Sequence, residues 1–83
     1  PVLLNPQADI GVLCSGAGLT MTTMDLLEQG GGQTCCYFNV GGETNWDAAA
    51  ETFKQRLQQG LEQIAAMGQV RVILVNLISN LVP

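Results

Sequence analysis

The chain alternates between two hydrophobic patterns, and the first half shows each of them once. Residues 10–14 (Ile-Gly-Val-Leu-Cys) form an unbroken apolar run, which is typical of a strand buried on both faces. From Leu19 to Glu28 apolar side chains recur at mixed short spacings, which predicts a helix packed against a sheet. The apolar members of this helix are Leu19, Met21, Met24, Leu26 and Leu27. Glycines at 30–32 are expected to end it, because glycine is favoured just past a helix carboxyl terminus.

The second half of the chain repeats this alternation. Residues 34–40 are β-branched and aromatic and predict a second strand, and residues 70–77 predict a third, strongly apolar one. Between them lies a helical stripe of apolar residues: Trp46, Ala49, Ala50, Phe53, Leu57, Leu61, Ile64 and Ala65. Thr44 or Asn45 is expected to cap this helix. Gly60 lies inside it, where glycine costs about 1 kcal/mol relative to alanine, and is a candidate bend.

The predicted order of elements is β-α-β-α-β, which indicates an α/β fold with a parallel sheet and right-handed crossovers. We expect residues 1–83 to form a single domain. In such sheets ligands bind beyond the carboxyl ends of the strands. The predicted ligand edge therefore comprises residues 15–18, 39–43 and 76–83.

Composition indicates that part of the surface is covered by another domain or subunit. The chain is 47% hydrophobic and only 12% charged, against a usual charged fraction of about 25%. It begins without an initiator Met and ends just after an apolar run, so we expect a segment of a larger protein. A net charge of −4 with three cations argues against nucleic-acid binding. No apolar run approaches the about 20 residues needed to span a membrane.

The cysteines and the absence of histidine limit the chemistry. Cys14, Cys35 and Cys36 lack CxxC spacing, so zinc and redox motifs are disfavoured. Buried, reduced thiols in a cytoplasmic protein are the favoured interpretation. The chain has no histidine, which removes imidazole ligands and a histidine general base.

Gly16 and Gly18 stand between the first strand and the first helix. The amino terminus of a helix offers unpaired N–H groups and a partial positive charge to phosphate or carboxylate. A dinucleotide site is disfavoured, because Met21 stands where its third small residue belongs and Asn39 where its acidic ribose binder belongs. A Walker loop is excluded, since no Gly-Lys-Ser/Thr follows. A tight turn that serves packing alone is the alternative, and spacing does not decide between the two.

No catalytic residue is predicted. The carboxylates of Asp25 and Glu28 lie toward the far end of the first helix and are expected to be solvated. Lys54 and Arg56 are expected to lie far from Ser15, so no pair of nucleophile and base can be assembled.

Four short motifs together resemble the carboxyl-terminal domain of the β subunit of succinyl-CoA synthetase. They are Gly16-Ala17-Gly18-Leu19, Thr23-Met24-Asp25, Val40-Gly41-Gly42 and Val75-Asn76, and the resemblance extends over residues 10–82. It implies a flavodoxin-like, three-layer CoA-ligase domain, truncated relative to the family domain. It also implies that this domain packs against an α subunit, which carries the phosphohistidine, and follows an ATP-grasp region that binds the nucleotide.

The resemblance implies an acid–CoA ligase of the tricarboxylic acid cycle, inactive as the isolated segment. The full enzyme would use ATP or GTP, Mg²⁺ and CoA on a small carboxylic acid, and this segment would bind no cofactor itself. The positions that match the substrate- and phosphate-binding motifs of the family are Ser15, Gly16, Gly18, Asn80, Leu81 and Val82. Ser15 stands in place of the family Asn, Asn39 in place of an Asp, and Ser79-Asn80 in place of Gly-Gly. The alternative is therefore a non-catalytic subunit-interaction module that keeps the fold.

Overall fold

The computed structural model describes residues 1–41 and 46–77, and the side chains of the second helix from residue 51 onward. The elements are β1 (Val2–Leu3), β2 (Ile10–Cys14), α1 (Ala17–Gln29), β3 (Thr34–Asn39), α2 (Trp46–Ala65) and β4 (Val72–Asn76). The three strands and two helices predicted from the sequence are confirmed. β1 was not predicted, because two residues are too few to show a periodicity.

The four strands form one mixed sheet in the order β1-β3-β2-β4. β2 is parallel to both β3 and β4, as predicted, whereas β1 pairs with β3 in the antiparallel direction. The expectation of a wholly parallel sheet is therefore wrong at one edge. The physical reason is a tight turn after β1, in which the Ala8 N–H donates to the Asn5 carbonyl and the Gln7 N–H to Asn5 Oδ1. This turn reverses the chain, so β1 and β2 flank β3 with opposite directions.

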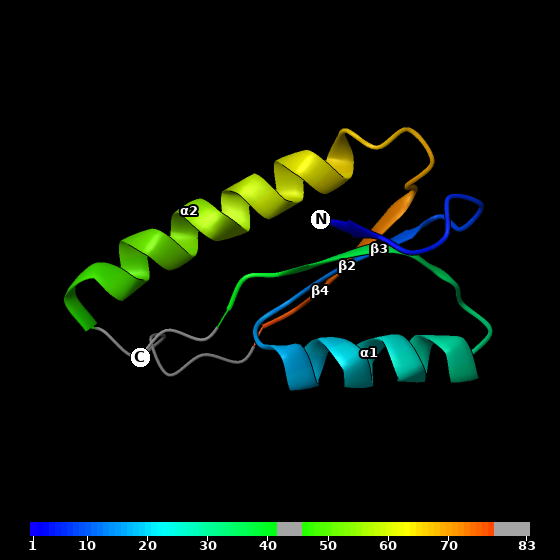
Figure 1. The fold of residues 1–83 in the computed structure, drawn as a ribbon, viewed down its shortest axis with the longest axis horizontal. Helices are drawn as coiled ribbons and strands as arrows, with labels where there is room; N and C mark the ends of the chain where they lie inside the picture. Colours follow the sequence, from blue (N-terminus) through cyan, green and yellow to red (C-terminus); the bar gives the residue numbers. More distant parts are fainter. Residues whose placement is uncertain (42–45, 78–83) are drawn as a thin grey trace.

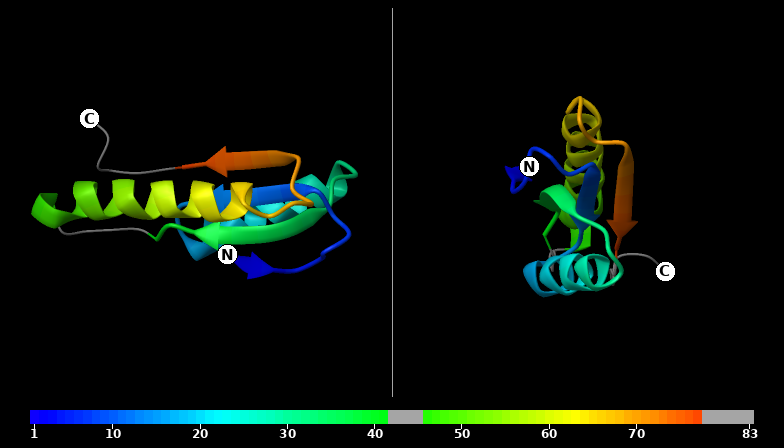
Figure 2. Two further views of the ribbon diagram at one scale, coloured as in Figure 1. Left: turned by 90° about the horizontal axis from the view of Figure 1, so that it is seen from above. Right: turned by 90° about the vertical axis from the view of Figure 1, so that its right-hand side faces the viewer.

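The two helices lie on opposite faces of the sheet (Figure 1). Figure 2 shows the same arrangement from the end, with β2, β3 and β4 between α1 and α2. α2 lies close to the sheet at Gly60, where an added Cβ would lie 2.7 Å from Phe38 Cδ1 and 2.8 Å from Leu13 Cδ1. Gly60 is thus explained by the close approach of helix and sheet rather than by a bend.

The core lies mainly between α2 and the sheet. Leu13 and Ile64 are fully buried, and partly buried side chains of α2 pack against them: Phe53, Leu57 and Leu61. These positions of the predicted stripe are confirmed, whereas Ala65 is exposed, and Trp46, Ala49 and Ala50 lie outside the described side chains. The prediction of buried thiols is confirmed, because all three cysteines are buried and free.

α1 packs differently from the prediction. Thr20 and Thr23 are its buried residues, whereas the side chains of Met21 and Leu26 are 58% and 62% exposed. The threonines are suited to this contact because their hydroxyls are hydrogen-bonded: Thr20 Oγ1 donates to the Gly16 carbonyl, and Thr23 Oγ1 accepts from Asn76 Nδ2. Leu19, Met24 and Leu27 are partly buried, so Met21 and Leu26 are the exposed members of the predicted apolar set.

The glycine-rich end of α1 is confirmed. Gly31 has a φ of 92°, a backbone conformation that favours glycine. The Gly31 N–H donates to the Glu28 carbonyl at 3.0 Å and the Gly32 N–H to the Leu27 carbonyl at 2.8 Å. These two bonds form a Schellman motif, which satisfies carbonyls that the helix leaves unpaired.

Candidate anion site at the carboxyl edge of the sheet

The turn from β2 into α1 requires glycine at its centre. Gly16 is the N-cap of α1 and has a φ of 94° and a ψ of 147°, so a side chain at this position would strain the backbone. It supplies no side-chain cap, and the first turn of α1 has no acidic residue. The N–H groups of the first helical turn have no acceptor within a helix. The partial positive charge at the start of α1 therefore favours an anion.

Gly18 is a glycine that the described structure does not require. It lies in the first turn of α1, its φ is not positive, and an added Cβ would meet no atom within 4 Å. Neither backbone conformation nor packing within the described residues therefore calls for glycine, although glycine costs about 1 kcal/mol relative to alanine in a helix. The absence of a side chain here leaves the backbone accessible from outside.

Asn39, at the end of β3, is hydrogen-bonded through its side chain to two glycine turns. Its Oδ1 accepts hydrogen bonds from the Gly16 N–H and the Gly41 N–H, each at 2.8 Å. A main-chain bond from the Val40 N–H to the Cys14 carbonyl, at 2.9 Å, joins the same two strand ends. The Gly16 N–H is therefore engaged within the protein, and the following N–H groups of the first turn of α1 are those without a partner inside the helix.

Ser15 lies beside the third strand end of this edge. It is buried, and its N–H donates to the Asn76 carbonyl at 3.3 Å. Asn76 in turn donates through Nδ2 to Thr23 Oγ1 of α1 at 3.2 Å. The structure therefore brings together Ser15, Gly16 and Gly18 with the ends of β3 and β4, whereas the predicted site residues Asn80, Leu81 and Val82 lie outside the described residues.

Arg56 was expected to lie far from Ser15, but the structure places its guanidinium at this edge, against the end of β3. Its Nε donates to the Val40 carbonyl and its Nη2 to the Asn39 carbonyl, each at 2.8 Å. The guanidinium carbon lies 5.7 Å from the centroid of the Phe38 ring. The side chain therefore holds the end of β3 from the α2 face. No motif could have revealed it, because the contact depends on how far α2 runs back along the sheet.

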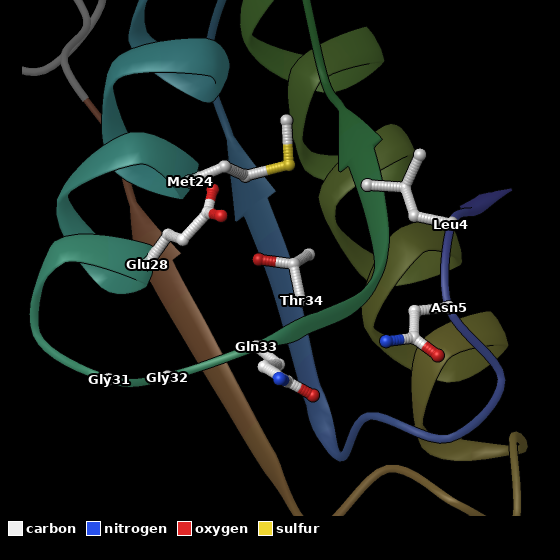
Figure 3. A pocket seen from close by; sticks show the side chains of 8 residues that line it. All are labelled: Leu4, Asn5, Met24, Glu28, Gly31, Gly32, Gln33 and Thr34. Carbon is white, nitrogen blue, oxygen red and sulfur yellow. The ribbon is translucent and has the colours of Figure 1, made fainter.

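A pocket of about 440 Å³ lies at the opposite, amino edge of the parallel strands. Figure 3 shows Met24 and Glu28 of α1 on one side of it and Leu4 and Asn5 of the amino-terminal segment on the other. Its polar groups belong to exposed or half-exposed residues. Because ligands of parallel α/β sheets bind beyond the carboxyl ends, this pocket is not the candidate site.

Titratable groups add little to the carboxyl edge. Asp25 and Glu28 are exposed, as predicted. Burial raises the pKa of the Cys36 thiol, and the neighbouring Cys35 raises it further, so Cys36 is a poor nucleophile and a structural thiol. Among the side chains described, those of residues 1–41 and 51–77, no three Cys, Asp or Glu gather in a way that could hold a metal ion.

The fold and this edge define an α/β domain in which a glycine turn opens a helix at the carboxyl ends of parallel strands. The family model for the CoA-ligase domain matches residues 13–79, so the chain belongs to the CoA-ligase family. No solved structure shows a significant match to the chain. Neither of the helices described is long and apolar enough to cross a membrane.

Several curated relatives are β subunits of ADP-forming succinate–CoA ligase. The chain is 39% identical over 76 residues to the one from Ruthia magnifica, and 32% identical over 75 residues to the one from Staphylothermus marinus. These alignments cover 92% and 90% of the chain. The relative from Anaplasma marginale is 41% identical over 58 residues, or 70% of the chain. The chain spans only 15–18% of the length of these three relatives.

Proposed function

We propose that this chain is the CoA-ligase domain of a β-type subunit of an ATP-grasp acid–CoA ligase, and that its carboxyl edge helps to bind phosphate or the acid. Family membership and the names of the relatives support the reaction class. The chain itself would contribute the N–H groups of a helix amino terminus rather than a nucleophile or a base, with the Arg56 guanidinium at the end of β3. Its chemical contribution is therefore electrostatic stabilisation of an anion.

The observation that carries this proposal is Gly18. Its backbone conformation is open to any residue, and an added Cβ would meet nothing within 4 Å. A glycine that the described fold does not need is explained if a ligand or a partner approaches the backbone closely from outside. The anion would then accept hydrogen bonds from the N–H groups of Ala17, Gly18 and Leu19, with Ser15 beside them.

The larger assembly is part of the proposal. The sheet would be the core of a flavodoxin-like, three-layer domain spanning residues 1–83. An α subunit would supply the phosphohistidine and cover part of the exposed apolar surface, which includes Met21 and Leu26. The complete enzyme would use ATP or GTP with Mg²⁺ and CoA, all bound outside this domain, and a small carboxylic acid such as succinate. Asn80, Leu81 and Val82 would complete the acid and phosphate site.

A non-catalytic interaction module is the second candidate. Two observations favour it: Ser15 stands where the family has Asn, and the outer face of α1 exposes Met21 and Leu26, which suits a subunit contact. Such a module would keep the fold and the interface without binding substrate.

The test uses the longer protein that carries this chain together with its partner subunit. Nucleotide turnover is measured across a panel of dicarboxylic acids, with and without CoA. Turnover that needs both the acid and CoA, and that falls in Gly18→Ala but not in Gly68→Ala, supports the ligase. Gly68 is the matched control, because an added Cβ there also meets nothing within 4 Å while the residue lies in the α2–β4 connection, at the amino edge. Assembly of the subunits without any such turnover would contradict the ligase and favour the interaction module.

A further inference from the structure

The pocket at the amino edge of the parallel strands has the size of a small-molecule site. Its volume of about 440 Å³ lies within the range of about 300–1,000 Å³ that is usual for such sites. One wall is α1 with the glycines that follow it, and the other is the segment after β1, at Leu4 and Asn5 (Figure 3). Gln33 and Thr34, where β3 begins, lie between the walls. These residues define the amino-edge pocket, which lies apart from the candidate anion site.

The amino-edge pocket offers apolar surface to a hydrocarbon stem. The side chains of Met24 and Leu4 extend toward each other across β3 (Figure 3). Leu4 is 51% exposed and Met24 is half-buried, so each leaves part of its apolar surface open. The unbranched thioether of methionine adapts its shape to what it contacts. A short chain of methylene groups is therefore suited to the space between these two side chains.

The electrostatics of the amino-edge pocket favour a cation. Glu28 is the one charged residue among the described residues that line it. Within the described part of the chain, no hydrogen bond or ion pair engages the Glu28 carboxylate. The carboxyl end of α1 adds a partial negative charge, and its last turn has no basic residue to offset this charge. The carboxylate therefore lacks a counter-ion in this part of the chain, and a cationic ligand would supply one.

The uncharged groups of the pocket favour a primary ammonium group. An ammonium has three N–H donors and no acceptor, so it is best bound by several oxygens. The Thr34 hydroxyl points toward the Glu28 side of the pocket (Figure 3). Asn5 Oδ1 accepts one hydrogen bond, from the Gln7 N–H at 2.9 Å, and has a second lone pair. A quaternary ammonium is less suited, because aromatic rings usually bind such groups and none is among the described lining residues.

We propose that the amino-edge pocket binds a primary ammonium group on a short hydrocarbon stem, with the Glu28 carboxylate as its counter-ion. Met24 and Leu4 contact the stem. A free amine and a lysine side chain from another part of the protein assembly both present this group. The pocket lies at the opposite edge of the sheet from the candidate anion site, so the inference does not depend on the proposed function.

The test is a titration of the chain with n-butylammonium chloride, followed at the amides of residues 28–34 by nuclear magnetic resonance. Ionic strength is held constant with sodium chloride. We expect saturable shifts at these amides, and about threefold weaker binding in Glu28→Gln, as for the loss of one exposed ion pair. n-Butanol, which has the same stem without the charge, is expected to bind more weakly than n-butylammonium.

Asp25→Asn is the matched control. Asp25 lies on the same helix and is exposed like Glu28, but it does not line the pocket. The substitution removes the same charge, so it separates a local contact from the general effect of net charge, and n-butylammonium should bind as it does to the unchanged chain. Both variants alter exposed side chains and should fold normally. No saturable response in the unchanged chain, or equal binding by the two variants, would overturn the proposal.

The longer protein with its partner subunit distinguishes the two sources of the ammonium group. Binding of n-butylammonium to this assembly as well as to the chain indicates a site for a free amine. Binding to the chain alone indicates that a lysine side chain of the assembly fills the pocket, and Glu28→Gln should then lower the melting temperature of the assembly more than Asp25→Asn does. Equal melting temperatures of these variants, with no binding to the assembly, would overturn the proposal.

Discussion

The two faces of the sheet use glycine in opposite ways. On the α2 face, Gly60 is buried against Leu13 and Phe38, and the contact leaves no room for a side chain. On the α1 face, Gly18 is exposed and surrounded by open space. Packing within the chain explains Gly60, whereas nothing within the described residues explains Gly18.

The side chains that the two helices pack against the sheet also differ between the two faces. α2 buries Ile64 among apolar neighbours, as expected for a helix whose stability comes from hydrophobic packing. α1 instead lays Thr20 and Thr23 against the sheet and leaves Met21 and Leu26 exposed. The α2 face therefore stabilises the fold mainly by apolar packing. The α1 face instead makes polar contacts, which link α1 to the end of β4. The following experiments are ordered from the largest expected effect on stability to the smallest.

Gly60→Ala tests the α2 face. We expect it to lower the free energy of unfolding by about 1–3 kcal/mol, because the new methyl group overlaps Phe38 and Leu13 and forces them to shift. The gain in helix propensity offsets this by at most about 1 kcal/mol. Urea unfolding followed by circular dichroism measures the difference. A variant as stable as the unchanged chain would show that the two layers are not in close contact at Gly60.

Thr23→Val tests the polar contact of α1. The substitution keeps the shape of the side chain but removes the oxygen that accepts from Asn76 Nδ2 at 3.2 Å. We expect the free energy of unfolding to fall by about 1 kcal/mol, as for a typical lost hydrogen bond. Thr22→Val is the matched control, because Thr22 is exposed on the same helix and should tolerate the change. Equal stabilities of the two variants would argue that the bond contributes nothing.

Cys36 provides a pH-dependent test of how tightly the α2 face excludes water. Burial and then Cys35 raise the pKa of its thiol above the ordinary value of 9.0. The unfolded chain therefore loses this proton at a lower pH than the folded chain. The free energy of unfolding should be unaffected below pH 9.0 and should fall as pH rises above it. Cys36→Ala should show a smaller fall above pH 9.0 in the same urea measurements, and an equal fall would assign the effect to other groups.

Much of this fold could be predicted from sequence patterns, and the exceptions have physical causes. The unbroken apolar run of β2 and the glycines after α1 are local signals, and both are confirmed in the structure. The face that α1 presents to the sheet could not be predicted, because buried hydroxyls are favourable only when a partner such as Asn76 lies opposite. Arg56 was missed for the same reason: its partners are carbonyls distant in sequence.

For the candidate site, too, the local features could be predicted from the sequence and the contacts between distant residues could not. The Gly16–Gly18 spacing marked the turn but left packing and ligand binding equally open. The structure distinguishes the two glycines, since Gly16 is required by its φ of 94° and Gly18 is not required by φ or by packing. The spacing of glycines in the sequence cannot make this distinction, because it depends on which atoms a Cβ added at each position would meet in the folded chain. The Asn39 bond to Gly16 likewise joins the end of β3 to the N-cap of α1, 23 residues apart in sequence.

The most direct test of the anion site is Gly18→Ala in the chain, measured for both stability and phosphate binding, with Gly68→Ala as the control. We expect Gly18→Ala to be as stable as the unchanged chain or more stable, by at most about 1 kcal/mol. We also expect it to lose the phosphate response at the amides of residues 17–19, which Gly68→Ala retains. A Gly18→Ala chain that is clearly less stable, or that still binds phosphate as the unchanged chain does, would contradict the account.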